Sequence, residues 1–375
     1  MEGPNIRAKR EVESLKREIL SSRQFTWLVS LYIIGSSILI IPSSLAGEAK
    51  QDAWMAATLA GVIGILLVVF YSLFIKNFPD LTFVQANERI LGKWMGKIVS
   101  LSFFSFTFLL AALVLRNIGD FFTTQILIET PLEVIFAVFL VVIIMGARLG
   151  IETIARACEI FFPWVFGLLF ILVVLLLPEI KVENIQPVFD GGFKPILRAT
   201  LPFIGLPFLE LIIFLMIHPS VNATKSIRRD FLKGTIVGGL MLFVVIVLCL
   251  LVLGVDFTAR NAYPTYVLAK KVNIGQFIQR IEVIVAIIWM LSIYFKLVLL
   301  YYVSALGLSQ VIEMEDYRPL LFPLGIITIV LAQISYPDIV YVQEFISKTW
   351  IFYASTYGFL LPVFLLLIAR IRKII

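Results

Sequence analysis

Two short stretches place helix-interrupting residues inside apolar sequence. Residues 32–42 read YIIGSSILIIP, and residues 201–210 read LPFIGLPFLE. Glycine weakens a helix, and proline removes one of its amide donors. Where a helix opens, the N–H groups at a new helix N-terminus can hold an anion and freed carbonyl groups can hold a cation. Together the two stretches predict a site for a zwitterion, a molecule that carries one charge of each sign.

The residues that would hold such a ligand come from both stretches. We expect a carboxylate near the amides of Gly35, Ser36 and Ser37, and an ammonium group near carbonyl groups that flank Gly205. The alternative is that each stretch is a kink that packs closely on a neighbour, with the serines bonded to their own helix. The surroundings are apolar and aromatic, so the ligand side chain should be modest and uncharged. The candidates are Ile34, Gly35, Ser36, Ser37, Phe203, Ile204, Gly205 and Leu206, with weaker ones near mid-membrane at Thr107, Leu110, Trp289 and Ser292.

Four of the ionisable residues within the apolar spans are candidates for function, because a charge there is costly. Arg116 and Asp120 are four positions apart, so they can pair on one helix face, which favours a structural role. Glu210 ends the second stretch, one turn beyond the break in it, and Lys296 lies near the middle of a later span. Lys296 either takes the place of a coupling cation or pairs with Glu210 for stability. The sequence leaves both alternatives open.

The composition is that of an integral membrane protein. Of the 375 residues, 60% are hydrophobic and 15% charged, and the mean hydropathy is +1.00. The net charge of +6 reflects basic loops, so we expect no nucleic-acid partner. The sequence contains no metal-ligand spacing, no glycine-rich phosphate loop and no Ser–His pair with a base in reach. We therefore expect neither an enzyme nor a metal or cofactor site, and we interpret the single histidine, His218, as solvated at a membrane surface.

The elements that must position these residues are helices that cross the bilayer. Spans need about 20 apolar residues, and on that basis the sequence predicts an all-α protein with ten transmembrane helices. Residues 1–23 alternate charges and are interpreted as a cytoplasmic tail, and residues 24–375 as a single transmembrane domain. The spans are expected near residues 24–46, 53–76, 97–127, 131–147, 153–177, 199–218, 231–255, 273–309, 319–335 and 338–370.

The ten helices divide into two sets of five, about 24–177 and about 199–370. Because a repeat with an odd number of helices is inverted in the membrane, helices 1 and 6 become equivalent, and both are interrupted. With the N-terminus inside, the cytoplasmic tails and loops carry 20 basic residues and the opposite side carries 9. Both termini are therefore expected to face the cytoplasm.

Two motifs resemble known families. Residues 35–42, GSSILIIP, are similar to the Gly-Ser-Gly-Ile-x-x-x-Pro signature in the first helix of amino acid–polyamine–organocation transporters. The ten-helix plan resembles the five-plus-five inverted repeat of that superfamily, the LeuT-like fold. Residues 146–163, GARLGIETIARACEIFFP, more specifically resemble the spore germination permease family, the B-subunits of germinant receptors in spore-forming bacteria.

The resemblance implies a multi-pass subunit of the spore inner membrane that senses a small germinant, commonly an amino acid. It implies an A-subunit and a lipoprotein C-subunit as partners. Ser37 stands where transporters usually carry a second glycine, and helix 5 lacks the lysine that proton-coupled relatives place there. We therefore interpret the chain as a receptor with a transporter's architecture, with helices 3 and 8 at the sides of the site. The alternative is a stand-alone amino acid transporter coupled to protons or sodium.

Overall fold

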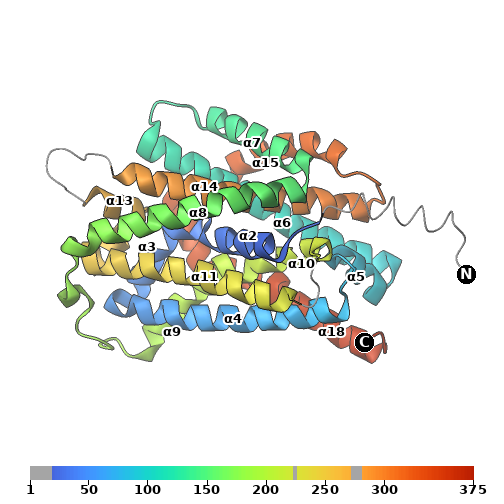
Figure 1. Ribbon diagram of the computed structural model, residues 1–375, viewed down its shortest axis with the longest axis horizontal. Helices are drawn as coiled ribbons and strands as arrows, with labels where there is room; N and C mark the ends of the chain where they lie inside the picture. The colour runs from blue at the N-terminus through green and yellow to red at the C-terminus, as the bar shows by residue number, and fades with distance from the viewer. Residues whose placement is uncertain (1–18, 223–225, 272–280) are drawn as a thin grey trace, which may run out of the picture.

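The computed structural model describes residues 19–222, 226–271 and 281–375. Within these ranges the regular structure is helical, apart from one isolated bridge between Leu20 and Val221. Most helices run along the long axis of the molecule and pack side by side (Figure 1), as expected of segments that cross a bilayer.

The first predicted span is split into two helices. The helix α2 (Ser22–Ile34) begins with a capping box, in which Ser21 and Gln24 each bond the other's backbone N–H, and it ends at Gly35. The helix α3 (Ser37–Ala49) begins two residues later. The next helices of the first half are α4 (Ala53–Asn77), the short α5 (Phe83–Leu91), α6 (Lys93–Phe121), α7 (Leu132–Leu149) and α8 (Ile151–Leu176).

The sixth predicted span is also irregular. It starts as α9 (Phe193–Phe203), widens into a π-turn at Ile204–Phe208, tightens into a 3-10 turn at Leu209–Ile213 and ends as α10 (Phe214–Ile217). The rest of the second half consists of α11 (Ile227–Leu248), the short α12 (Val255–Arg260) and α13 (Pro264–Lys270), α14 (Glu282–Val311), α15 (Arg318–Ile334), and a last span made of α16 (Ile339–Phe345), α17 (Ile351–Ser355) and α18 (Leu361–Ile371).

Eight stretches of the described residues are long and apolar enough to cross a membrane. Two predicted spans are not counted separately, for simple reasons. The first is divided into two 13-residue helices, the second of which runs on into α4. The ninth, α15, has 17 residues. The predicted eighth span began at residue 273, and its first residues, 273–280, lie outside the described ranges; α14 begins at Glu282.

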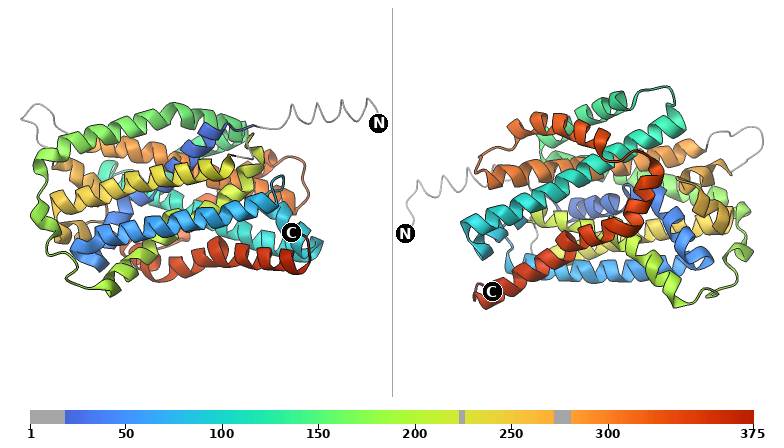
Figure 2. Two further views of the ribbon diagram at one scale, coloured as in Figure 1. Left: turned by 60° about the horizontal axis from the view of Figure 1, so that its bottom comes forward. Right: turned by 180° about the vertical axis from the view of Figure 1, so that it is seen from behind.

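The packing of the helices repeats between the two halves. The helix α2 packs on α11 as α9 packs on α4, and α7 packs on α14 as α15 packs on α6. The helix α8 lies on the face seen in Figure 1, and the α16–α18 segment lies on the opposite face (Figure 2). Exchanging the first five spans with the last five converts each of these relations into its counterpart, which is what an inverted repeat produces.

Candidate functional site

The site begins at the break between α2 and α3. The Gly35 N–H still donates to the Leu31 carbonyl at 2.9 Å, but Ser36 already precedes the N-terminus of α3, and its side chain does not cap that helix. A Cβ atom on Gly35 would lie 2.6 Å from Cδ of Lys296 and 2.9 Å from the carbonyl oxygen of Tyr32. Position 35 must therefore be glycine because a lysine side chain passes directly over the break.

Lys296 forms a fully buried ion pair with Glu210. Its Nζ lies 2.6 Å from Oε2 of Glu210, and both side chains have 0% exposure. The same Nζ donates to Oγ of Ser36 at 3.0 Å and lies 5.2 Å from the centre of the Tyr32 ring. One ammonium group thus joins α14 to the interrupted sixth span and to the break in the first.

Further polar groups lie beside this pair and the neighbouring cavity. The Tyr32 hydroxyl and the Trp350 indole N–H lie next to the Glu210 carboxylate as additional donors. Within the described part of the chain, the Ser37 hydroxyl and Oδ1 of Asn117 have no hydrogen-bond partner. An unsatisfied buried polar group costs about 1–3 kcal/mol, so a polar ligand that supplies partners here would be stabilised.

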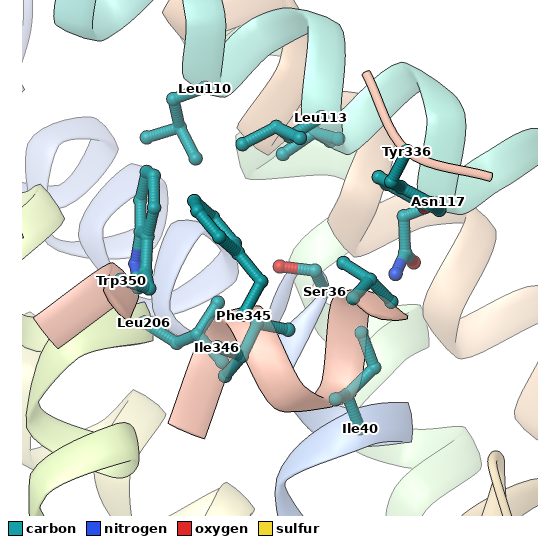
Figure 3. Close-up of a pocket in the computed structure, with 12 residues that line it drawn as sticks. Ser36, Ile40, Leu110, Leu113, Asn117, Leu206, Tyr336, Phe345, Ile346 and Trp350 are labelled. Carbon is teal, nitrogen blue, oxygen red and sulfur yellow. The ribbon is translucent and has the colours of Figure 1, made fainter. Parts of the chain in front are cut away.

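A small cavity lies beside Ser36 (Figure 3). The volume open to the centres of water molecules is about 40 Å³, which is room for only a few waters. In Figure 3 the Phe345 ring lies between Trp350 and Ser36. An amino acid fits only if this side of the cavity moves. The lining residues are Ser36, Ile40, Leu110, Leu113, Val114, Asn117, Leu206, Tyr336, Val342, Phe345, Ile346 and Trp350.

Residues 19–338 match the family model described as spore germination protein. The chain belongs to this family. Its relatives include spore germination protein KB of Bacillus subtilis (strain 168), 26% identical over 363 residues that cover 96% of each chain. They also include spore germination protein GerLB of Bacillus cereus, 27% identical over 77% of this chain and 78% of that protein. The family assignment drawn from residues 146–163 is confirmed.

Solved structures show the fold. The transporter MhsT in complex with L-phenylalanine has a TM-score of 0.72 at 14% identity, over 92% of this chain and 88% of that one. The nucleobase-cation-symport-1 transporter Mhp1 has a TM-score of 0.52 at 13% identity, over 88% of this chain and 75% of that one. The predicted LeuT-like membrane fold, all-α and with interrupted helices 1 and 6, is confirmed.

Of the eight residues predicted from the two interrupted stretches, two line this cavity. Ser36 and Leu206 line it, as does Leu110 from α6. Gly205 lies behind it, where an added Cβ would meet Cδ1 of Trp350 at 3.4 Å and Cα of Ile351 at 3.5 Å. The other predicted members of the stretches are buried next to these positions: Ile34, Gly35, Ser37, Phe203 and Ile204.

Three of the weaker candidates are not among the lining residues. The Thr107 hydroxyl accepts a hydrogen bond from Ser304 at 2.9 Å, and the Ser292 hydroxyl donates to the Trp289 carbonyl at 3.0 Å. The Trp289 ring packs against Phe121 with centroids 4.5 Å apart. These residues therefore lie in helix–helix contacts of the core. The sequence did not show this, because an evenly apolar helix does not reveal which of its faces points to the site.

The tenth span contributes lining residues that the sequence did not indicate. Phe345, Ile346 and Trp350 come from α16 and the turn that follows it, and Tyr336 precedes α16. Asn117 on α6 was also missed, although a polar residue beside Arg116 in an apolar helix was a usable signal. Nothing local in the sequence brings residues 336–350 to the breaks, because that contact depends on tertiary packing.

Arg116 and Asp120 form an ion pair, with Nε 2.9 Å from Oδ1. Nη1 of Arg116 also donates to the carbonyl groups of Gln333 at 2.9 Å and Ala332 at 3.3 Å, near the C-terminus of α15. Oδ2 of Asp120 accepts from the Tyr336 hydroxyl at 2.6 Å. The pair lies beside the cavity and holds Tyr336, so it is a positioning group.

One expectation needs correction. His218 is not solvated: it is 2% exposed, and its ring nitrogens lie 3.0 Å from the carbonyl oxygens of Leu215 and Phe78. Near Gly205 the sixth span passes through π- and 3-10 turns, and the Glu210 carboxylate supplies a negative charge that pairs with Lys296. Among the described residues, no cluster of three or more His, Cys, Asp or Glu side chains forms a group able to hold a metal ion.

Proposed function

We propose that this chain is the germinant-binding membrane subunit of a spore germinant receptor and that its germinant is a small amino acid. One observation carries the proposal: the buried Lys296–Glu210 pair meets the break of helix 1 beside an apolar cavity. In this proposal the N-terminal amides of α3 and the Ser36 hydroxyl hold the carboxylate of the ligand. The leucine, isoleucine and aromatic lining suits an uncharged side chain.

Membership of the family supports a receptor setting. We place the chain in the spore inner membrane with both termini cytoplasmic, in a complex with an A-subunit and a lipoprotein C-subunit. Germinant binding between helices 1 and 6, with α6 and α14 at the sides, shifts a core bundle against a scaffold. The free energy of that shift comes from the ligand's higher affinity for one of the two arrangements. The small cavity supports this proposal, because a bound amino acid requires a wider arrangement than the present one.

The test uses spores that carry bulky substitutions at the two breaks. At position 35, leucine has no room beside Lys296, and at position 205 it would press on Trp350 and α17. We expect Gly35→Leu and Gly205→Leu to abolish the germination response while the protein still inserts. Gly47→Leu is the matched control, because nothing lies within 4 Å of a Cβ atom there. A normal response in both break variants would remove the proposal.

The alternative is an ion-coupled amino acid transporter that works alone. The observation that favours it is the fold, which MhsT and Mhp1 share. Vesicles that contain only this chain distinguish the two functions. Accumulation of a labelled amino acid driven by a proton or sodium gradient would favour the transporter, and binding without accumulation would favour the receptor.

A further inference from the structure

We propose that the Lys296–Glu210 pair is an internal substitute for a zwitterionic ligand. In the closed site the two side chains neutralise each other. When an amino acid binds, its carboxylate replaces Glu210 as the partner of Lys296, and its ammonium group replaces Lys296 as the partner of Glu210. This inference rests on the proposed function and adds to it the role of the ion pair in recognising the ligand and the means by which binding changes the protein.

The first argument is chemical identity. A lysine ammonium group and a glutamate carboxylate are the two charged groups of an α-amino acid, held here 2.6 Å apart with no solvent exposure. They meet where Ser36 both lines the cavity and accepts a hydrogen bond from Lys296. A carboxylate that entered beside Ser36 would therefore arrive directly at the lysine.

The second argument is that the pair leaves its surroundings unsatisfied. A buried ion pair stabilises a protein only when further hydrogen bonds complete it. Here the Tyr32 hydroxyl and the Trp350 indole N–H lie beside the Glu210 carboxylate as additional donors, and the Ser37 hydroxyl, next to the break, has no hydrogen-bond partner within the described residues. The site thus has more polar groups than the pair uses. A ligand that brings its own carboxylate and ammonium group provides the additional partners.

The third argument concerns specificity. If each ligand charge replaces one member of the pair, a ligand with a single charge leaves the other side chain buried and unpaired. Amines and simple carboxylic acids are then rejected, while α-amino acids are accepted.

The exchange also changes how the protein is held together. In the closed site Lys296 ties α14 to the sixth span through Glu210 and to the first span through Ser36. Once the ligand binds Lys296 and Glu210, the direct contacts of Lys296 with Glu210 and Ser36 are replaced by contacts through the ligand. The first and sixth spans are then free to move relative to α14, which gives the conformational shift a physical trigger.

The experiment measures equilibrium binding to the purified full-length chain with two probe sets. One set is L-alanine, ethylamine and propionate, and the other is L-phenylalanine, 2-phenylethylamine and 3-phenylpropionate. The amine and the acid in each set lack the carboxylate and the ammonium group, respectively. The variants are Lys296→Met, Glu210→Gln and the double variant. The double variant has two neutral side chains and so no unpaired buried charge, which keeps the test valid if a single variant fails to fold.

For wild type we expect the amino acid of at least one set to bind about 100-fold more tightly than its amine or acid, as the cost of one unpaired buried charge implies. Lys296→Met should shift preference toward the amine, Glu210→Gln toward the acid, and the double variant should lose the preference for the amino acid while keeping its melting temperature within a few degrees.

A double variant that keeps the wild-type order of preference overturns the inference but leaves the proposed function standing. If no amino acid in a panel of twenty binds wild type, the proposed function itself fails.

Discussion

At the scale of single residues, the close contact between Lys296 and Gly35 restricts which amino acids fit at these two positions. The lysine side chain crosses the backbone where α2 ends, and its Cδ and Cβ atoms lie 2.6 and 3.1 Å from where a Cβ atom on residue 35 would be. The break and the ion pair are therefore one unit. A change at position 35 must displace Lys296 from Glu210 or from Ser36.

Replacing Gly35 with alanine tests that unit. Overpacking in a buried site costs about 1–3 kcal/mol, so we expect Gly35→Ala to lower the melting temperature of the purified protein and to weaken amino acid binding. The matched control is Gly47→Ala, because Gly47 lies in α3 and has nothing within 4 Å of an added Cβ. Equal effects of the two substitutions would show that the contact of residue 35 with Lys296 contributes neither to stability nor to binding.

At this scale the sequence indicates part of the site. The composition of residues 35–37 identifies the break, because glycine and serine in an apolar helix have a local meaning. Pairing of Lys296 with Glu210 was one of two alternatives, and choosing between them required a distance across 86 positions of sequence. Tyr336 and Trp350 could not be predicted, because aromatic residues in a membrane span are ordinary in composition.

At the scale of elements, Arg116 connects α6 to the end of α15. Its guanidinium group satisfies carbonyl oxygens at Ala332 and Gln333, which a helix C-terminus leaves without intrahelical donors. Through Asp120 it also fixes Tyr336 at the entrance to α16. The start of the tenth span, and with it one wall of the cavity, depends on this contact.

Removing the guanidinium group should therefore be costly. We expect Arg116→Met to destabilise the protein by about 3 kcal/mol, because it leaves Asp120 charged in a nearly buried setting. Lys348→Ala removes one partner of the exposed Lys348–Glu344 pair and should leave the melting temperature almost unchanged. Thermal unfolding in detergent compares them, and similar losses would contradict the role given to Arg116.

A second contact between elements should depend on pH. Glu313 follows α14 and lies 2.7 and 2.8 Å from the ammonium groups of Lys93 and Lys97 at the start of α6. Hydrogen bonds from these lysines lower the pKa of Glu313 from its usual value of 4.5 to about 2. Since the folded-state pKa is the lower one, the stabilisation is present above about pH 4.5 and is lost as the pH falls toward 2.

Glu313→Gln isolates this effect. We expect a lower melting temperature than wild type at neutral pH, a difference that shrinks as the pH falls below about 4.5, and a smaller difference in high salt, because the side chain of Glu313 is 55% exposed. A difference that stays constant with pH would show that the carboxylate charge does not join α14 to α6.

The elements were predictable to the extent that they are regular. Length and hydropathy located the spans, and paired glycine and proline located the irregular ones. The π- and 3-10 turns at Ile204–Phe208 and Leu209–Ile213 were not predictable, because they change which carbonyl each N–H bonds without changing composition. The burial of His218 was not predictable either, because it depends on tertiary packing: one of the carbonyl groups at its ring is that of Phe78, at the end of α4.

At the scale of the whole molecule, the inverted repeat brings the two irregular spans together. The contact α6–α14 joins equivalent helices of the two halves, so it lies on the axis that relates the halves, and the contact α3–α9 joins the two interrupted spans. A site on that axis is shared by both halves, and a ligand there contacts both at once. This arrangement explains why the charges from α14 and the sixth span meet at the break of the first span rather than within one half.

The central claim is that an amino acid binds between the breaks of helices 1 and 6. The most direct measurement is equilibrium binding of the twenty amino acids to the purified chain, wild type and Gly35→Leu, with Gly47→Leu as the control. We predict that wild type and Gly47→Leu bind the same small group of uncharged amino acids and that Gly35→Leu binds none of them. Absence of binding to wild type, or unchanged binding to Gly35→Leu, would contradict the account.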